Sequence, residues 1–170
     1  MWLAIKVIGF TILIPGVVTL LIPSVLAKGH LFFLISTAQG WHLAGWFLVS
    51  NGILLYILSA AVFAIRGRGT PAPVDPPKQL IVGGVYSFTR NPMYLAVLSL
   101  VLGLSVLLGL WPLLGYAIFL FLFFHVVVVF YEEPTLRRQF GGTYEEYCKK
   151  VPRWWFRLKG NRHQGMCLNF

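Results

Sequence analysis

Residues 93–131 read MYLAVLSLVLGLSVLLGLWPLLGYAIFLFLFFHVVVVFY, and this stretch decides the fold of the chain. It contains no Asp, Glu, Lys or Arg, and its one proline, Pro112, follows Trp111 near the middle. Because a membrane core about 30 Å thick requires about 20 apolar residues for each helical crossing, the stretch is long enough for two crossings. Only Trp111 and Pro112 separate its halves, 93–110 and 113–131, so we expect a tight helical hairpin.

Two more apolar runs, 2–26 and 42–65, precede this hairpin and are also long enough to cross a bilayer. Of the 170 residues, 58% are hydrophobic and 11% are charged, and the mean hydropathy is +0.76, far from the balance of a soluble domain. We therefore predict an all-α polytopic membrane protein, in which residues 1–170 form a single membrane domain with about four transmembrane helices.

The rest of the chain divides by composition around these runs. A loop rich in Pro and Gly, 66–92, separates the N-terminal helix pair, 1–65, from the hairpin, and its composition excludes one continuous helix. After the hairpin we expect an amphipathic and interfacial segment, 132–158, followed by a tail, 159–170.

The segment 132–158 carries apolar residues at intervals of three and four, which predicts an amphipathic helix along the membrane surface or against the bundle. These residues are Leu136, Phe140, Tyr144, Tyr147 and Val151. We expect Gly141-Gly142 to break the helix, a capping box of Thr143 and Glu146 to restart it, and Pro152 to end it. The aromatic residues that follow are typical of an interfacial anchor: Trp154, Trp155 and Phe156.

The basic residues fall almost entirely on one side of this topology. With an even number of crossings, Lys6, the basic residues of the 66–92 loop and the eight basic residues after position 136 share one side, and Lys28 lies opposite. Since cytoplasmic loops carry an excess of Lys and Arg, we expect both termini and the loop to be cytosolic. The chain is then an integral membrane protein, of the inner membrane if its source is bacterial.

Charge and cysteine content exclude several other classes. The formal charge of +9 comes from residues that flank apolar runs, so we expect membrane lipids and no nucleic acid as partners. Two cysteines, Cys148 and Cys167, are too few for a disulfide framework, and no His or Cys residues have the spacing of metal ligands. Residues 167–170 have the outline of a prenylation box, but Asn169 is not aliphatic and we expect no modification there.

Two polar blocks adjoin the hairpin. The first, GVYSFTRNPMY at 84–94, leads into the third apolar run, and the second begins with Glu132-Glu133 directly after the fourth. A tight hairpin places the two blocks together at the cytosolic membrane surface, and this is the central prediction. Among these residues Arg90 suits a carboxylate, either glutamate suits an ammonium or hydroxyl groups, and the aromatic rings suit a base or a sulfonium.

Simpler interpretations of the same residues stay open. Arg90-Asn91-Pro92 is also an ordinary helix start, with proline in its favoured first turn, and Glu133 is also placed to pair with Arg137 four residues later. His125 lies in an apolar run, where a histidine either hydrogen-bonds a neighbouring helix or faces a substrate as a base.

The spacing G-x-Y-x-x-x-R-[HN]-P-x-Y in 84–94, followed by E-E-x-x-L-x-x-x-F-G-x-x-Y-x-x-Y-x-x-x-V-P in 132–152, resembles the membrane methyltransferases typified by isoprenylcysteine carboxyl methyltransferase. Phospholipid N-methyltransferases look similar over the same blocks. The resemblance covers about residues 78–156, and it is the pairing of the two blocks that makes it specific.

The resemblance implies methyl transfer that depends on S-adenosylmethionine, in a pocket built from the loop before the third run, the Arg-Asn-Pro turn and the acidic pair. It implies a cofactor site made of Leu80, Ile81, Tyr86, Arg90, Asn91, Pro92, Met93, Tyr94, Glu132 and Glu133. Our catalytic candidates are Arg90 and Glu133, the latter as proton acceptor if the methyl acceptor is an amine or a thiol. In-line displacement at a sulfonium requires no metal, so none is expected.

Two positions depart from the family pattern. Asn91 stands where a histidine is usual, and Val128 stands where the prenylcysteine enzymes hold an arginine thought to engage the substrate carboxylate. The methyl acceptor is therefore open: an isoprenylcysteine-like carboxylate, a phospholipid amine, a thiol, or another lipophilic or small molecule. The rival class is a non-enzymatic assembly or transport protein that uses the same helices and basic tail to bind lipids or partners.

Overall fold

The computed structural model describes residues 16–26, 42–66 and 79–156, and all regular structure within these residues is helical. The elements in chain order are η1 (Val17–Leu21), α2 (Ile22–Leu26), α4 (His42–Arg66), η2 (Gly84–Ser87), α5 (Pro92–Leu108), α6 (Trp111–Val127), η3 (Val128–Glu132), α7 (Glu133–Phe140) and α8 (Gly142–Lys150). The start of the first apolar run, the loop at 67–78 and the tail from 157, with Cys167, lie outside the described residues.

The predicted hairpin is confirmed, although its turn lies two residues earlier than expected. Helix α5 ends at Leu108 and is capped by Gly109, whose φ of +62° is the left-handed conformation that favours glycine. The Ser105 carbonyl accepts a bond from Leu110 N at 3.2 Å, and the Ser105 hydroxyl donates to Leu110 O at 3.2 Å. Trp111 and Pro112 belong to the first turn of α6, where proline is well tolerated because the amide hydrogen it lacks has no helical partner there.

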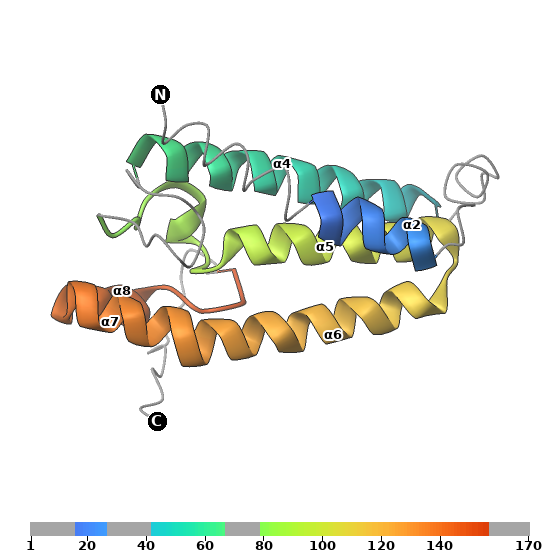
Figure 1. The fold of residues 1–170 in the computed structure, drawn as a ribbon. Coiled ribbons are helices and arrows are strands. Elements are labelled where there is room, and N and C mark those ends of the chain that lie inside the picture. Colours follow the sequence, from blue (N-terminus) through green and yellow to red (C-terminus); the bar gives the residue numbers. More distant parts are fainter. Residues whose placement is uncertain (1–15, 27–41, 67–78, 157–170) are drawn as a thin grey trace.

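Helix α4 lies along α5 with little between the two backbones (Figure 1). A Cβ added at Gly103 of α5 would lie 2.9 Å from the Gly45 carbonyl oxygen and 2.9 Å from Val49 N, both on α4. The Ser99 hydroxyl donates to the Leu48 carbonyl across the same interface at 2.8 Å. Small residues thus let α4 and α5 approach closely, as is common where two apolar helices pack without water.

Helices α6 and α7 form one long rod joined through the π-helical turn η3 (Figure 1). The π turn, in which Glu133 N bonds to Val128 O, adds an extra residue to the helix and rotates everything after it relative to α6. In the first half of α6, the Tyr116 hydroxyl donates a hydrogen bond to the Val18 carbonyl at 3.2 Å, which joins η1 to the bundle.

Helix α8 turns back beside α7 at the end of the bundle remote from the α5–α6 turn (Figure 1). The predicted break at the glycine pair is confirmed, since α7 ends at Phe140 and Gly141 has a φ of +52°. The predicted capping box is wrong: Gly141 is the N-cap of α8, no side chain caps it, and its carbonyl accepts from the amides of Tyr144 and Glu145. Helix α8 therefore begins at the Gly141 backbone, without the side-chain cap predicted at Thr143.

The predicted apolar stripe forms a cluster in which Tyr144, Tyr147, Cys148 and Val151 are buried. Three partly buried residues pack against the same cluster: Leu136 and Phe140 of α7, and Leu80 of the loop before α5. The stripe therefore joins α7 and α8 to the loop in front of the hairpin.

Among the described residues, two helices are long and apolar enough to cross a membrane, His42–Phe63 and Trp111–Phe140, whereas Pro92–Leu108 and Val17–Leu26 are shorter apolar helices. Large apolar side chains face outward on both long helices, such as Phe47, 69% exposed, and Phe119, 61% exposed. An outward apolar surface of this extent is typical of a helix in contact with lipid.

We predict that Gly103→Ala lowers the thermal midpoint of the protein in detergent, because its new methyl group meets the backbone of α4. Overpacking of this kind costs roughly 1–3 kcal/mol. Gly115→Ala in α6 is the matched control, since nothing lies within 4 Å of a Cβ there, and its midpoint should stay the same or rise. Equal midpoints for the two variants would contradict the close α4–α5 contact.

Candidate functional site

The loop before α5 is fixed against α4 by a glycine and a buried tyrosine. Gly84 has a φ of +64°, and a Cβ there would lie 2.8 Å from a methyl carbon of Val62 on α4. Gly84 is the first residue of helix η2, in which Tyr86 is buried with Ile81 and Phe63. Two residues of the predicted cofactor site, Ile81 and Tyr86, thus pack against Phe63 of α4.

The same loop is bound to α8 through Tyr147, whose hydroxyl donates to the Tyr86 carbonyl at 2.6 Å. Burial raises the pKa of the Tyr147 phenol, and the nearby Arg90 opposes that change only in part. The phenol therefore stays protonated near neutral pH, which preserves its hydrogen bond to the loop.

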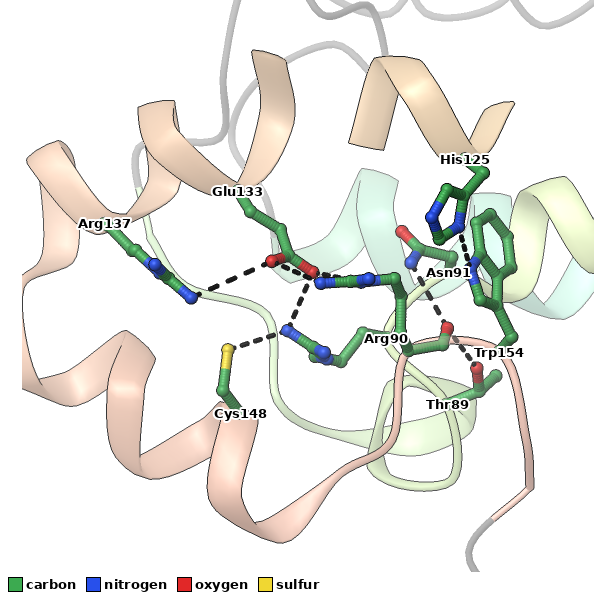
Figure 2. A network of polar contacts seen from close by, with 9 residues as sticks. Thr89, Arg90, Asn91, His125, Glu133, Arg137, Cys148 and Trp154 are labelled. Atoms are coloured by element: carbon green, nitrogen blue, oxygen red, sulfur yellow. Dashed lines mark hydrogen bonds and ion pairs between the residues drawn. The ribbon is translucent and has the colours of Figure 1, made fainter. Parts of the chain in front are cut away.

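A buried carboxylate lies at the centre of the contact between the two polar blocks (Figure 2). Glu133 is 5% exposed, and its Oε1 lies 3.0 Å from Arg90 Nη1 and 2.6 Å from Arg153 Nε, while its Oε2 accepts from Arg153 Nη2 at 2.9 Å. Arg90 Nη1 also donates to Cys148 Sγ at 2.7 Å. We call the Arg90–Glu133–Arg153 group the clamp, because it joins the loop, α7 and the chain after α8.

Residues 151–156, which we call the C-terminal strap, complete the connection. Three consecutive residues before α5, 89–91, each donate a hydrogen bond to a carbonyl of the strap. The bonds are Thr89 Oγ1 to Arg153 O at 3.1 Å, Arg90 N to Pro152 O at 3.0 Å, and Asn91 Nδ2 to Arg153 O at 3.2 Å. The Arg-Asn-Pro turn is therefore both a helix start and part of the contact with the second block.

Tyr94 and Glu132 meet at the mouth of the hairpin, where the Tyr94 hydroxyl donates to Glu132 Oε1. The Tyr94 ring lies 4.5 Å from the Phe124 ring and 6.4 Å from the Trp154 ring, centroid to centroid. A carboxylate bonded to a tyrosine whose ring packs against other aromatic rings is an arrangement that suits a cationic ligand.

His125 hydrogen-bonds the strap, because Trp154 Nε1 lies 3.0 Å from His125 Nδ1 (Figure 2). An indole nitrogen only donates, so Nδ1 accepts and the imidazole carries its proton on Nε2. Trp154 is thus half-buried against His125 and Phe121, and only Trp155 and Phe156 are exposed as an interfacial anchor requires. Of the two interpretations of His125, the structure favours the hydrogen bond to a neighbouring segment.

The prediction that the two blocks lie together is confirmed by the bonds that join 86–94 to 132–153. The predicted pair of Glu133 with Arg137 is present but secondary, at 4.0 Å, beyond direct hydrogen-bond distance. Within this region Pro92 is buried, Met93 is half-buried, and Val128 is 1% exposed. In the described part of the chain, no three His, Cys, Asp or Glu side chains are grouped to hold a metal ion.

Sequence reasoning missed the contacts of Cys148 and Trp154, and it named no partner for Arg153. Arg153 stands next to the Val-Pro motif, and its position one residue beyond that motif was the only available signal. Nothing local in the sequence links Cys148 to Arg90 or Trp154 to His125, because each pair lies far apart along the chain.

Fold and site together define a helical membrane protein with its polar chemistry gathered at one end of an apolar hairpin. The chain belongs to the phospholipid methyltransferase family, whose pattern matches residues 40–143 and so includes α4, the hairpin and both polar blocks up to the start of α8. The resemblance found from the two motif blocks is confirmed by this match.

Two curated relatives extend the comparison. The chain is 36% identical over 83 residues to a Delta(14)-sterol reductase of Mus musculus, covering 47% of this chain and 19% of the relative. It is 36% identical over 74 residues to the protein-S-isoprenylcysteine O-methyltransferase of Schizosaccharomyces pombe, covering 43% and 31%. The chain thus spans less than a third of either relative. No solved structure matches it.

We predict that Glu133→Gln strongly destabilises the folded protein, because the buried Arg90 and the partly buried Arg153 then lose their counter-charge. Removing one partner of a buried ion pair costs roughly 3–5 kcal/mol. The measurement is the free energy of unfolding in mixed micelles, followed by tryptophan fluorescence.

Glu146→Gln is the matched control for this change. Glu146 pairs with Lys150 at 4.0 Å on the surface of α8, where both side chains are more than two-thirds exposed. Its loss should change stability by about 0.5 kcal/mol or less. Similar losses for Glu133→Gln and Glu146→Gln would show that the clamp is not a structural centre.

Proposed function

We propose that this protein is a membrane methyltransferase that uses S-adenosylmethionine and methylates a lipophilic or small acceptor. The observation that carries the proposal is the Tyr94–Glu132 pair, framed by the rings of Phe124 and Trp154. Family membership supports the reaction type, and the relative named as an isoprenylcysteine O-methyltransferase supports it independently.

The residues around this pair fit the cofactor by chemical type. S-adenosylmethionine supplies a methyl group on a positively charged sulfonium, together with an ammonium, a carboxylate, ribose hydroxyls and an adenine. Glu132 offers an acceptor for an ammonium or hydroxyl, Tyr94 offers an aromatic face and a hydroxyl, and Met93 and Asn91 lie beside them at the start of α5. Leu80 and Ile81 provide apolar surface for a base.

We assign different tasks to the two glutamates. Glu133 is buried and both its oxygens already bind arginine, so with Arg90 it holds the site together and positions the adjacent residue. Glu132, which is half-buried and bonded to Tyr94, is then the carboxylate placed to contact a ligand or accept a proton from an amine or thiol. The rate would come from alignment of acceptor and methyl and from exclusion of water.

We propose four crossings, with both termini and the site on the cytosolic side. The rod from Trp111 to Phe140 is about 45 Å long at 1.5 Å per residue, longer than a core of about 30 Å. If Trp111, 81% exposed, marks one interface, the opposite interface falls about 20 residues later, next to Glu132. Helix α5, about 26 Å long, spans most of the core beside it.

This placement suits an acceptor that reaches the site from the bilayer. Residue 128, where the prenylcysteine enzymes hold a substrate-binding arginine, is here a buried valine, so a carboxylate would find no partner at that position. We therefore favour an acceptor bound through apolar contacts, with phospholipid amines and thiols ahead of a prenylcysteine carboxylate.

A second candidate function is a reduction, because the match to a sterol reductase extends over a longer segment than the match to the methyltransferase. Similarity over this segment alone does not separate the two chemistries. The methyltransferase proposal is favoured by the family match, which names that activity. A non-enzymatic role in assembly or transport does not explain why the chain carries the two paired motif blocks.

We predict that purified protein binds labelled S-adenosylmethionine saturably, and that Glu132→Gln weakens binding at least tenfold. Tyr94→Phe should weaken it less, because the ring remains while the hydroxyl is lost. Glu145→Gln, an equivalent change on the exposed face of α8, is the control and should bind as the unmodified protein does.

The matching product experiment incubates native membranes with methyl-labelled cofactor and identifies the labelled lipid. If the folded protein binds a nicotinamide nucleotide and does not bind S-adenosylmethionine, the reductase function replaces the proposed methyl transfer. Binding of neither would favour the non-enzymatic class.

A further inference from the structure

Positive charge around the clamp exceeds negative charge. The guanidinium groups of Arg90, Arg153 and Arg137 all face the single carboxylate of Glu133. The neighbouring carboxylate, Glu132, is turned to the Tyr94 hydroxyl. A partly buried region with surplus positive charge favours the entry of an anion.

Arg137 is the member of this group that Glu133 engages least. Its Nη2 lies 4.0 Å from Glu133 Oε2, whereas Arg153 makes two bonds shorter than 3.0 Å to the same carboxylate. Its Nε is buried and has no hydrogen-bond partner among the described residues. A buried donor without a partner is unfavourable, so contacts within the described residues leave this guanidinium group incompletely satisfied.

Arg137 is also within reach of a ligand. Its side chain is 28% exposed, compared with 8% for Arg90, so an anion can approach it without opening the clamp. Figure 2 shows the Arg137 side chain extending from α7 toward Glu133, with Cys148 of α8 below them in this view. The planar guanidinium presents paired donors that match two oxygens of a carboxylate or phosphate.

We propose that Arg137 binds an anionic oxygen group, a carboxylate or a phosphate, carried by a ligand of this site. The inference rests on the proposed function, which supplies two sources: the carboxylate of the cofactor and the phosphate of a phospholipid. It transfers to Arg137 the anion-binding task that sequence reasoning gave to Arg90, since Arg90 is committed to Glu133 and Cys148.

The first arm tests the cofactor source with Arg137→Gln and its neighbour Arg138→Gln as matched control, because Arg138 carries the same charge on the same helix but is exposed. Equilibrium binding is measured for S-adenosylmethionine and for decarboxylated S-adenosylmethionine. If the carboxylate binds Arg137, Arg137→Gln weakens the former at least tenfold and leaves the latter unchanged.

The second arm tests the lipid source. The shift in thermal midpoint is measured on adding phosphatidylglycerol, and again on adding diacylglycerol with the same acyl chains but no phosphate. If the phosphate binds Arg137, the shift specific to phosphatidylglycerol persists in Arg138→Gln and is lost in Arg137→Gln. Arg137→Lys, which keeps the charge but not the fork, should retain part of the effect in whichever arm responds.

Equal behaviour of Arg137→Gln and Arg138→Gln in both arms overturns the inference. Thermal midpoints measured without ligand verify that both variants are folded. Because Arg137 and Glu133 are 4.0 Å apart, we expect Arg137→Gln to lower the thermal midpoint only slightly. If the unmodified protein binds no S-adenosylmethionine, the proposed function itself is wrong. If the unmodified protein binds it, and Arg137→Gln changes neither this binding nor the lipid effect, only the role of Arg137 is wrong.

Discussion

One buried carboxylate holds the functional end of this protein together. Glu133 is 5% exposed and binds Arg90 from the loop before α5 and Arg153 from the C-terminal strap. Charges of this kind are costly to bury unless each has a partner, so the three segments that supply them must come together for the end of the bundle to fold. The carboxylate thus adds charged contacts to the hydrogen bonds and apolar packing that also join these segments.

The rest of the site depends on this coupling. Since Glu133 is fixed, the residue before it is fixed too, and Glu132 is directed to Tyr94 at the mouth of the hairpin. The strap that supplies Arg153 also supplies carbonyls to 89–91 and the indole that bonds His125. In the proposed function, a polar site at the end of an apolar hairpin receives a soluble cofactor from one side and a lipid from the other.

The hairpin, the helix break at Gly141 and the meeting of the two blocks could be predicted, because hydropathy, glycine and short loops act locally. The position of the turn could not, since Trp111-Pro112 suits either a loop or a first helical turn. The π turn at Val128–Glu132 has no marker in a run of valines, yet it sets the direction of both glutamates. The roles of Glu133, Cys148 and Trp154 arise from contacts between distant segments, which no local pattern encodes.

A double-mutant cycle between Glu133 and Arg153 tests the central claim most directly. The free energy of unfolding is measured in mixed micelles for the unmodified protein, Glu133→Gln, Arg153→Gln and the double variant. If the clamp joins α7 to the C-terminal strap, the second substitution costs much less once the first is present, with a coupling energy of about 2 kcal/mol or more. Additive losses, with a coupling near zero, would contradict the account.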